Sequence, residues 1–340
     1  MSRLRPIEII GGGLAGLSLG LALRRAGAPV VLYEAGEYPR HRVCGEFISG
    51  LSATTIARLG IAPLLADALE HRQVAWHIGD QLARIQRLPS PALALSRHAL
   101  DARLAAAFVA AGGELHPRTR VTDLAARPGR LFTTGRRRGR SPWLGLKIHA
   151  HDLPLSCGLE LHLGSQAYVG LAQIEGNHVN ICGLFQRREL CAKGGALILG
   201  YLQAAGLNAL AARLGAAGLE ADSFCAVAGV NFDRHVTRSG SVCLGDTCAM
   251  IPPFTGNGMA MAFQGAELAL GPLLAYVRGT ADWPGTGQLI HRALQQHFRV
   301  RLASAGVLHP FLLQPPRQRW LSALTRARLL PMRPLYALLH

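Results

Sequence analysis

Three glycines and one glutamate near the start of the chain have the types and spacing that bind a dinucleotide. Gly11, Gly13 and Gly16 fill a G-x-G-x-x-G pattern, and Glu34 follows about 20 residues later. In such a pattern the first glycine permits a tight turn, the second lets the backbone approach a pyrophosphate, and the third lets a helix pack closely on a strand. An acid at Glu34 can bind a ribose diol and would repel a 2′-phosphate, which predicts FAD or NAD rather than NADP.

The elements around these residues are those that a phosphate-binding turn requires. Ile7–Ile10 is a short β-branched run, typical of a buried parallel strand. Residues 14–26 are rich in Leu and Ala and predict a helix, whose first N–H groups, at Leu14 and Ala15, point at the phosphates. A lone glycine pattern is a weak signal, but a strand before it and a helix after it make the prediction specific.

A second glycine-rich turn repeats this logic later in the chain. Residues 241–245 predict a short strand, and a helix is predicted over residues 259–277. Asp246 follows the strand, where it can bind a hydroxyl of a ribityl chain. The turn before the helix brings bare N–H groups to a ligand, and a helix N-terminus stabilises the negative charge of a reduced flavin ring. The sequence therefore predicts FAD, with this turn supplying Gly256, Asn257 and Gly258.

Four further residues are candidates for contact with the cofactor. Arg42 lies just beyond the nucleotide strand, where a pyrophosphate or ribitol chain would pass. Arg97 begins a helix that Ser96 can cap, and from there it can reach a phosphate. The Cys44-Gly45 step suggests a backbone pressed against a flat group, so we expect both residues beside the isoalloxazine ring. The alternative for Arg42, Cys44 and Gly45 is an ordinary polar loop with a buried, inert cysteine, and for Arg97 it is a surface arginine.

The catalytic candidates are Cys44, Lys147 and His149. Lys147 and His149 share one face of a predicted strand through the two-residue period, and Tyr168 on another strand is a further candidate for the lining of a substrate pocket. Cys44 could shape that pocket or protonate a product. The alternative for the strand residues is a solvated sheet edge. No metal site is expected from the cysteines, because none of the 7 forms a C-x-x-C motif.

The order of strand and helix patterns predicts an α/β protein with two domains and a helical tail. Four strand-like runs over residues 142–186, with a hairpin signal at Gly176-Asn177, predict an antiparallel substrate sheet, and a hairpin around Gly79-Asp80 joins it. A strand over residues 115–124, a helical segment over 196–216 and a strand over 224–232 are also expected. The predicted limits are 1–72, 92–140 and 234–282 for a discontinuous Rossmann-like FAD domain, 73–91 and 141–233 for the substrate domain, and 283–340 for the helical region.

The composition narrows the classes of partner. The net charge is +16, but nearly all cations are Arg scattered among apolar residues, so we expect no nucleic-acid partner. The cysteines are read as small core residues in a reducing cytoplasm. The tail after residue 285 alternates Arg with apolar residues, and such a basic helix can lie on an anionic membrane or pack on its own domain. We therefore expect a cytoplasmic protein, with peripheral contact to the inner membrane as an alternative.

Taken together, the motifs resemble FAD-dependent oxidoreductases of the para-hydroxybenzoate hydroxylase fold, in the branch with geranylgeranyl reductases and related monooxygenases. The matching stretches are I-I-G-G-G-L-A-G with Glu34, P-R-H-R-V-C-G-E-F-I-S, L-S-R-H-A-L-D-A-R-L, and L-G-D followed by P-P-F-T-G-N-G-M-A-M-A. The resemblance implies a substrate sheet that covers the flavin ring. It also implies FAD held by Gly11, Gly13, Gly16, Glu34, Arg42, Arg97, Asp246 and the Gly256–Gly258 turn.

Two departures from the family bear on function. Thr134 stands where relatives usually carry an acid, which predicts weaker support for FAD. The strand over residues 168–175 lacks the aromatic pattern of prenyl reductases, which favours hydroxylation with O₂ over reduction of C=C bonds. We therefore expect a monooxygenase acting on a hydrophobic small molecule, with NAD(P)H or another electron donor. The alternatives are a C=C reductase and a non-catalytic flavin module for electron relay.

Overall fold

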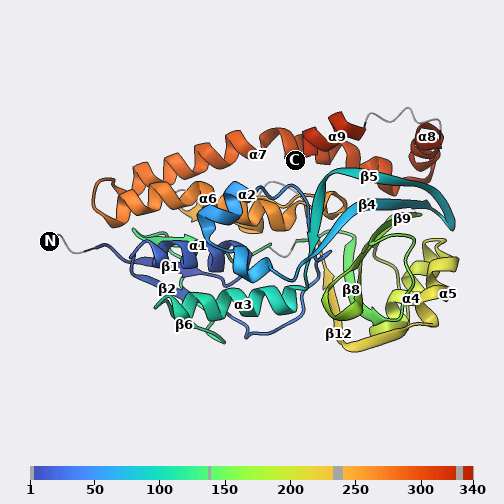
Figure 1. Ribbon diagram of the computed structural model, residues 1–340, viewed down its shortest axis with the longest axis horizontal. Helices are drawn as coiled ribbons and strands as arrows, with labels where there is room; N and C mark the ends of the chain where they lie inside the picture. Colours follow the sequence, from blue (N-terminus) through green and yellow to red (C-terminus); the bar gives the residue numbers. More distant parts are fainter. Residues whose placement is uncertain (1–3, 137–138, 233–239, 327–331, 340) are drawn as a thin grey trace.

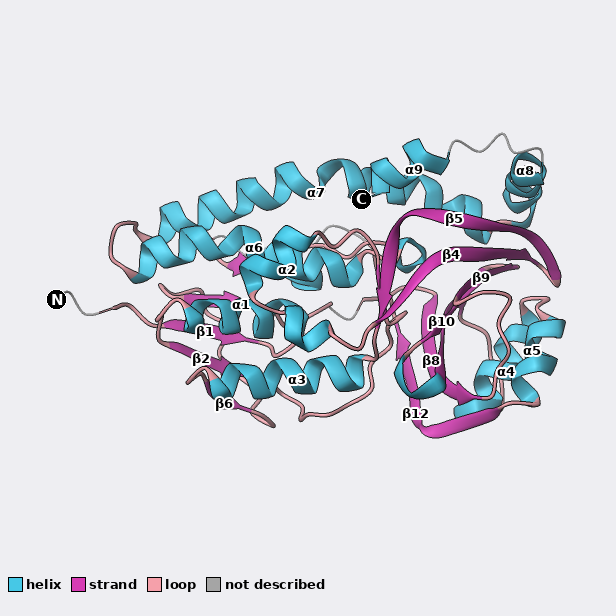
Figure 2. Ribbon diagram, in the orientation of Figure 1, coloured by secondary structure: helices cyan, strands magenta, loops and turns pink. Residues whose placement is uncertain are grey.

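The computed structural model describes residues 4–136, 139–232, 240–326 and 332–339 (Figure 1). Two sheets lie side by side along the long axis of the molecule, and the C-terminal helices run over both (Figures 1 and 2). The predicted α/β architecture, with a parallel Rossmann-like sheet, a separate large sheet and a helical C-terminal region, is confirmed. The predicted domain limits stay a prediction; strand β4 of the large sheet begins at Leu69, close to the expected limit at 72.

The parallel sheet has its first strand at the centre. Among the described residues the strand order is β13-β7-β1-β2-β6, and every neighbouring pair is parallel. The central strand is fully buried at Ile7 and Ile9, as its apolar run predicts. The strands are β1 (Ile7–Ile10), β2 (Val30–Tyr33), β6 (Glu114–His116), β7 (Arg130–Phe132) and β13 (Val242–Cys243).

Helix α1 (Leu14–Arg25) packs on this sheet, and two further helices pack against α1. These are α3 (Arg97–Ala110) and α6 (Gly258–Val277). The predicted cap of α3 is confirmed, since the Ser96 hydroxyl accepts a hydrogen bond from the N–H of Ala99 at 3.0 Å. Helix α6 is the one described helix long and apolar enough to cross a membrane, and 56% of its most apolar stretch is buried inside the protein. A short helix α2 (Ala53–Leu59) also contacts α6.

The large sheet follows the order β12-β8-β11-β10-β9-β4-β5-β3. Its neighbours are antiparallel, as predicted, except that β4 and β9 pair in parallel. One face packs on the helices α4 (Gly194–Ala204) and α5 (Asn208–Gly215), and the other face turns toward the nucleotide-binding half. The strands are β3 (Phe47–Ile48), β4 (Leu69–Ile78), β5 (Gln81–Ala94), β8 (Trp143–His151), β9 (Leu159–Gly164), β10 (Ala167–Gln173), β11 (His178–Gln186) and β12 (Gly218–Ala228).

The C-terminal helices connect the two halves. Helix α7 (Trp283–Leu313) contacts β13 of the parallel sheet as well as β9 and β10 of the large one, and it lies above both in Figure 1. Helices α8 (Pro315–Arg326) and α9 (Met332–Leu339) follow it. The predicted helical region is confirmed for the described residues.

Two predicted strands were wrong in extent, and one predicted helical segment is divided. The strand expected over 115–124 ends at His116, because Pro117 has no N–H to donate and Arg118 has a positive φ of 56° that turns the chain away. The helical segment expected over 196–216 comprises two helices, separated at Gly206 with φ 77°. The strand expected over 224–232 begins at Gly218 and ends at Ala228, because its polar first half pairs with β8 at a sheet edge.

Candidate active site

The first glycine turn has the backbone geometry that its pattern predicts. Gly11 has a φ of 112°, and a Cβ there would lie 2.3 Å from the carbonyl oxygen of Thr133. A Cβ on Gly16 would lie 2.2 Å from the carbonyl oxygen of Gly11, so only glycine lets α1 approach the strand this closely. By contrast, a Cβ on Gly13 would meet nothing within 4 Å. The turn therefore leaves open space at the N-terminus of α1, where a phosphate fits.

Glu34 lies at the end of β2, directly against this turn. Its Oε2 accepts a hydrogen bond from the N–H of Gly12 at 2.8 Å, and its Oε1 accepts one from the N–H of Gly36 at 2.8 Å. Arg40 adds an ion pair to Oε1 at 2.8 Å. The carboxylate is buried and its orientation is fixed by the chain itself, beside the space that a ribose would fill.

Arg42 and Arg97 meet at one buried carboxylate. The Nε of Arg42 donates to Asp101 at 2.8 Å, and Arg97 donates to both oxygens of Asp101 at 2.8 and 2.9 Å. The Nη2 of Arg42 is buried without a hydrogen-bond partner among the described residues. This orphaned donor suits a phosphate or ribose oxygen, whereas the structure turns the guanidinium of Arg97 toward Asp101. Asp101 was not among the predicted site residues, although its spacing of four residues from Arg97 indicates such a pair.

Asp246 lies in a short turn, Gly245–Thr247, that follows β13. A Cβ on Gly245 would lie 3.3 Å from the Cβ of Ala15, which places this turn beside the start of α1. The hydroxyl of Thr134 lies 3.5 Å from that of Thr247. The next residue, Gly135, donates its N–H to the same hydroxyl at 2.9 Å. The segment around Thr134 therefore supports the turn that carries Asp246.

The second glycine turn packs against β3 and α9, two elements that are distant from it in the sequence. Gly256 has a φ of 68°, and a Cβ there would lie 2.1 Å from the ring of Phe47. Its carbonyl oxygen accepts a hydrogen bond from the N–H of Ser49 at 3.3 Å. Asn257 is fully buried, and its amide donates to the carbonyl oxygen of Leu339 in α9. The turn before Gly258 and α6 is thus held between β3 and the C-terminal helix.

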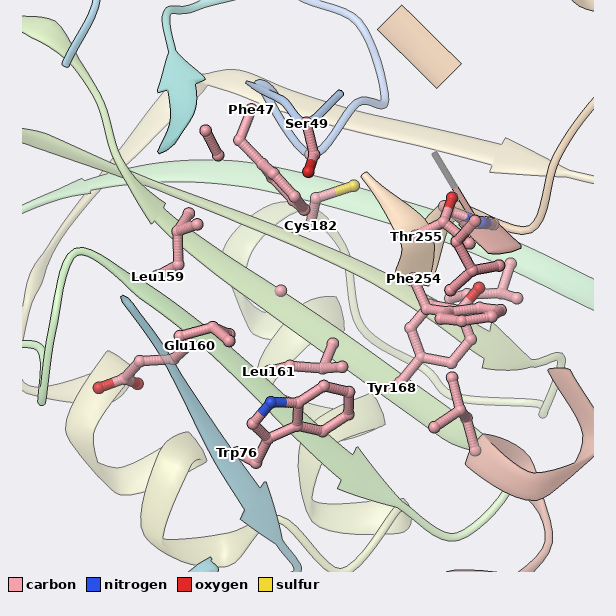
Figure 3. Close-up of a pocket in the computed structure, with 18 of the residues that line it drawn as sticks. Phe47, Ser49, Trp76, Leu159, Glu160, Leu161, Tyr168, Cys182, Phe254 and Thr255 are labelled. Carbon is pink, nitrogen blue, oxygen red and sulfur yellow. The ribbon is translucent and has the colours of Figure 1, made fainter. Parts of the chain in front are cut away.

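A cavity of about 250 Å³ lies between this turn and the large sheet. Leu159, Leu161 and Tyr168 rise from the sheet, and Phe47, Phe254 and Thr255 close the opposite side (Figure 3). The C-terminal helices complete the wall. Cys44 and Gly45 border the cavity, which is where the sequence placed the flavin ring, although their contact with a flavin stays a prediction. The further lining residues are mainly apolar: Val43, Trp76, Leu88, Leu171, Leu184, Met250, Leu308, Phe311, Leu312, Leu335 and Leu339.

Arg87, Arg136 and Glu160 border the cavity, but the thiols of Cys44 and Cys182 and the phenol of Tyr168 in its lining are uncharged. Burial raises the pKa of the Cys44 and Cys182 thiols, so both remain thiols at neutral pH. Burial also raises the pKa of Tyr168 well above its ordinary value, which keeps the phenol protonated. A thiolate or phenolate nucleophile is therefore not available on this wall, and the cavity suits an apolar molecule.

Lys147 and His149 share one face of β8, as predicted, but they are not among the residues that line the cavity. Both side chains contact the carboxylate of Glu46, which is fully buried and has a positive φ of 56°. His149 Nε2 lies 2.6 Å from one carboxylate oxygen, and Lys147 Nζ lies 3.8 Å from the other and 3.0 Å from Nδ1 of His41. Burial, followed by the charge of Lys147, lowers the pKa of His41 to about 4, so His41 is a neutral acceptor. The catalytic role of Lys147 and His149 stays a prediction.

Comparison with known proteins places this geometry in a family context. A family model described as an NAD(P)-binding Rossmann-like domain matches residues 9–46, which span the first glycine turn and Glu34. Menaquinone reductase of Mycolicibacterium smegmatis is 25% identical over 128 residues, or 36% of this chain and 31% of that protein. 3-Amino-4-hydroxybenzoate 2-monooxygenase of Streptomyces platensis is 38% identical over 93 residues, or 25% of this chain and 23% of that protein. The chain thus matches less than a third of the length of each of these relatives.

Solved structures match over nearly the whole chain at low identity. p-Nitrophenol 4-monooxygenase from Pseudomonas putida has a TM-score of 0.76 at 13% identity, covering 100% of this chain and 97% of its own. A geranylgeranyl bacteriochlorophyll reductase-like protein from Thermoplasma acidophilum has a TM-score of 0.72 at 15% identity, with coverages of 94% and 91%. At these identities the likeness is one of fold. The chain therefore has an FAD-type, Rossmann-like dinucleotide-binding domain within a fold that flavin-dependent monooxygenases share with a reductase-like protein.

Proposed function

We propose that the protein is an FAD-dependent monooxygenase that acts on a hydrophobic small molecule. The observation that carries the proposal is the presence of two features together. An open space for phosphates lies at Gly13, and an apolar cavity bordered by Cys44 and Thr255 lies where the sequence places the flavin ring. A cofactor with a nucleotide end and a flat redox-active end matches this arrangement.

The residues that would hold FAD follow from the geometry. The first glycine turn and Glu34 would take the pyrophosphate and ribose, the orphaned Nη2 of Arg42 would donate to an oxygen of either, and Asp246 would bind the ribityl chain. The N-terminus of α6 after Gly258 would face the ring. When bound and reduced, FAD would supply the electrons that allow one oxygen atom of O₂ to be inserted into a substrate while the other is reduced to water, with NAD(P)H or another donor as the source of the electrons.

The protein's own contribution is position and exclusion of water. The apolar lining would bind the substrate and keep the reacting centre dry, which protects reactive species from water. Cys44, as a neutral thiol, would shape the pocket beside the ring. Lys147 and His149 act as positioning residues in this proposal, because they hold Glu46 and with it the segment that carries Cys44.

A C=C or quinone reductase is the second candidate function. The observation that favours it is Tyr168, whose phenol is buried and protonated in the cavity wall and could donate a proton to a reduced carbon. The local similarity to a menaquinone reductase points the same way. An electron-relay module, the third class considered, has no use for an enclosed apolar cavity of this size, so the cavity supports the enzyme functions.

One experiment separates these functions. The FAD-loaded protein is reduced and mixed with panels of hydrophobic phenols, alkenes and quinones, with O₂ and without it. The monooxygenase proposal expects O₂ uptake that matches the amount of hydroxylated product. If a quinone or alkene oxidises the flavin without O₂ and no hydroxylated product forms with it, the reductase is correct. If neither reaction occurs while a one-electron acceptor oxidises the flavin, the relay function is correct.

We also propose that the C-terminal helices rest on an anionic membrane surface at the cytoplasmic side. Leu289, Val300, Val307 and Phe311 are exposed on α7, and residues 300, 307 and 311 follow residue 289 by 11, 18 and 22 positions. These separations are about 3, 5 and 6 helical turns, so the four side chains form one apolar stripe. Trp320 on α8 is 72% exposed, and the chain's net charge of +16 suits anionic lipid. Because α7 to α9 also wall the cavity, a lipid-soluble substrate would have a short path into it.

Vesicle binding tests this membrane contact. The full chain should sediment with phosphatidylglycerol vesicles and not with phosphatidylcholine vesicles. The double change Val307→Ser and Trp320→Ser should weaken binding about tenfold or more, because two large apolar side chains no longer enter the lipid. The control is Val109→Ser, which alters a valine that is 51% exposed on α3, away from α7 (Figure 1). Equal binding of both vesicle types, or equal loss in the control, would overturn the proposal.

A further inference from the structure

Three histidines and one glutamate converge on the solvent-facing end of the large sheet, outside the cavity. His149 and His151 lie on β8, His178 begins β11, and Glu220 lies on β12. In the strand register His178 is opposite His151, and Glu220 is opposite His149. Residues directly opposite one another, and residues two apart on a strand, share a face. The four side chains therefore form a compact group on three adjacent strands.

The ligand atoms of the group are close to one another. His178 Nε2 lies 2.7 Å from Oε1 of Glu220, His151 Nε2 contacts the same oxygen, and His149 Nδ1 lies 3.5 Å from Oε2. The nitrogen atoms of His151 and His178 and the carboxylate of Glu220 lie within 4.8 Å of one another. The side chain of His151 is 45% exposed, so the group is open to ions from solvent.

In two of these rings the outer nitrogen, which is the one that faces away from Glu220, already has a hydrogen-bond partner. His149 Nε2 lies 2.6 Å from the carboxylate of Glu46, and His178 Nδ1 lies 3.1 Å from the carbonyl oxygen of Glu175. Both partners only accept hydrogen bonds, so the proton of each neutral ring lies on that outer nitrogen. The other ring nitrogens, Nδ1 of His149 and Nε2 of His178, then present lone pairs to the carboxylate of Glu220. Lone pairs that face a carboxylate repel it unless a proton or a metal cation lies between them.

The backbone also aims Glu220 at the histidines. The pairing of β12 with β8 shifts register between Glu220 and Cys225, which is a bulge at the sheet edge. Within it the hydroxyl of Ser223 donates to the carbonyl oxygen of Glu220 at 2.7 Å and accepts from the N–H of His149 at 2.7 Å. The bulge is tied to β8 at the point where the four side chains meet.

The geometry points to a binding site for a divalent transition metal of the Zn²⁺ class, formed by His149 Nδ1, His151 Nε2, His178 Nε2 and the Glu220 carboxylate. Imidazole nitrogens with one carboxylate are a donor set that Zn²⁺ prefers, and hydrogen bonds from the outer ring nitrogens to a carboxylate and a carbonyl are the usual support of such ligands. The ion ties β12, β8 and β11 together. Through His149 and Glu46 it also steadies the segment that carries Cys44 at the cavity.

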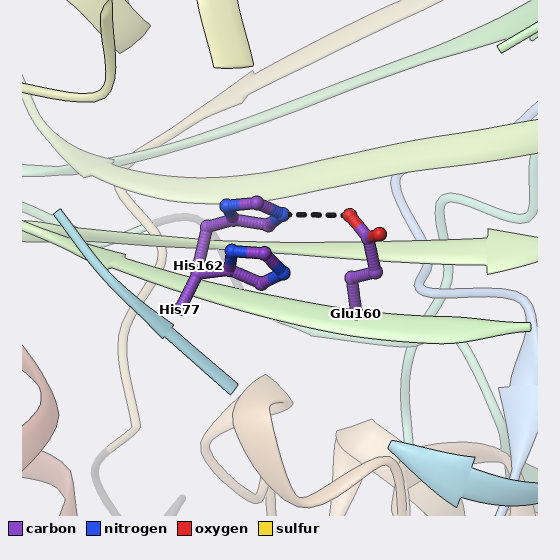
Figure 4. Close-up of side chains that lie close together, drawn as sticks. All are labelled: His77, Glu160 and His162. Atoms are coloured by element: carbon purple, nitrogen blue, oxygen red, sulfur yellow. Dashed lines mark hydrogen bonds and ion pairs between the residues drawn. The ribbon is translucent and has the colours of Figure 1, made fainter. Parts of the chain in front are cut away.

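A second histidine cluster shows what distinguishes this group. His77, Glu160 and His162 lie together on β4 and β9, with His162 Nε2 2.8 Å from Glu160 (Figure 4). There the guanidinium of Arg213 binds the same oxygen of Glu160, so the carboxylate already has a cationic partner. A divalent ion would face that guanidinium at short range. This cluster therefore serves as the control for the metal site.

The test uses the full-length, FAD-loaded protein, stripped with EDTA, dialysed and titrated with Zn²⁺ or with Co²⁺ as an absorbing probe. We expect one ion bound per chain, a visible absorption band with Co²⁺, and a higher thermal midpoint with Zn²⁺. His151→Ala and Glu220→Gln should each lower Zn²⁺ affinity at least about tenfold, as losses at and around metal ligands do. His77→Ala should leave the affinity unchanged. These readouts do not depend on enzymatic activity.

Several results would overturn the site. The absence of stoichiometric Zn²⁺ binding to the unaltered protein would do so, and then protons alone would occupy the group. Loss of binding in His77→Ala with retention in His151→Ala would place the ion in the other cluster. Because Glu220→Gln keeps the shape of the side chain, its flavin content and circular dichroism show whether the fold is intact. An intact Glu220→Gln protein that still binds Zn²⁺ with full affinity would also exclude the site.

Discussion

Nη2 of Arg42 lies 3.9 Å from Oε2 of Glu34, and no described residue accepts a hydrogen bond from it. The opposite side of the same guanidinium is held by Asp101, which is fully buried. Asp101 therefore positions Arg42 at the nucleotide end of the site while it neutralises Arg97. The relationship joins the strand end that carries Glu34 to helix α3 and makes stability and cofactor binding depend on one carboxylate.

Removal of that carboxylate should destabilise the protein strongly. Asp101→Ala leaves two largely buried guanidinium groups without their partner, which costs about 3–5 kcal/mol of the free energy of unfolding. Asp67→Ala is the matched control, because Asp67 is 54% exposed where it pairs with Arg103, and such a pair contributes less than about 1 kcal/mol. Urea unfolding of the apoprotein measures both. Similar losses of unfolding free energy in the two variants would show that the buried carboxylate stabilises the protein no more than the exposed one.

Substitution of two glycines of the first turn should affect different properties, namely FAD binding in one case and the stability of the apoprotein in the other. Gly13→Val should abolish FAD binding yet leave the apoprotein about as stable as before, because the new side chain enters open space meant for a pyrophosphate. Gly16→Val should lower the stability of the apoprotein itself, since its Cβ would overlap the carbonyl oxygen of Gly11. Flavin stoichiometry and the thermal midpoint separate the two effects. Full flavin content in Gly13→Val would contradict the dinucleotide site.

Asp246 should matter for FAD, whereas an acid further along α6 should not. Asp246→Ala removes the proposed partner of the ribityl chain and should weaken FAD binding by at least about tenfold, as expected when a hydrogen bond to a charged group is lost. Glu267→Ala removes an ion pair with Arg58, whose side chain is 67% exposed, and should leave FAD affinity unchanged. Fluorescence titration of the apoproteins gives both affinities. Equal losses would mean that Asp246 does not contact the cofactor.

Acid should destabilise the protein through buried neutral histidines. His309 packs against Phe232 at a centroid distance of 4.9 Å, and burial lowers its pKa from 6.5 to about 4. The unfolded chain binds a proton here near pH 6.5 but the folded chain does not, so this contribution to stability is present above pH 6.5 and is lost as the pH falls to about 4. The loss is at most about 3 kcal/mol.

The variant His309→Phe removes that titration and fits the aromatic surroundings. Its unfolding free energy should fall less steeply between pH 6.5 and 4 than that of the unaltered protein. Unfolding curves across this range measure the slope. His291→Phe, which alters an exposed histidine of the same helix, is the control and should leave the slope unchanged. An unaltered slope in His309→Phe would show that His309 is protonated in the folded protein.

Cofactor binding should protect Cys44 from alkylation. Cys191 is exposed and should react first with a small uncharged reagent, while Cys44 should react slowly because burial raises the pKa of its thiol. If Cys44 lies beside the flavin ring, FAD should slow its reaction further and leave Cys191 unchanged. Mass spectrometry of digested protein follows each cysteine. Equal labelling of Cys44 with and without FAD would place the ring elsewhere.

Local sequence determined the nucleotide-binding half of this protein. The glycines at 11 and 16 could be assigned because a turn without a Cβ is a property of neighbouring residues, and the apolar runs before and after them define a strand and a helix through period alone. The cap at Ser96 and the turn at Gly176-Asn177 were predictable for the same reason, since their hydrogen bonds span only a few residues.

The tertiary structure decided what lies around the cofactor. Glu46, Asp101 and Leu339 come from segments far apart in the chain, and nothing local signals that a buried carboxylate will meet His149 or that the C-terminal helix will reach Asn257. The cavity has the same origin, because both faces of strand β10 are largely apolar and buried, and sequence period cannot tell the face that packs on helices from the one that borders a ligand. The histidine group on β8, β11 and β12 depends on strand register, which is set by pairing between distant segments and by a bulge that no residue type announces.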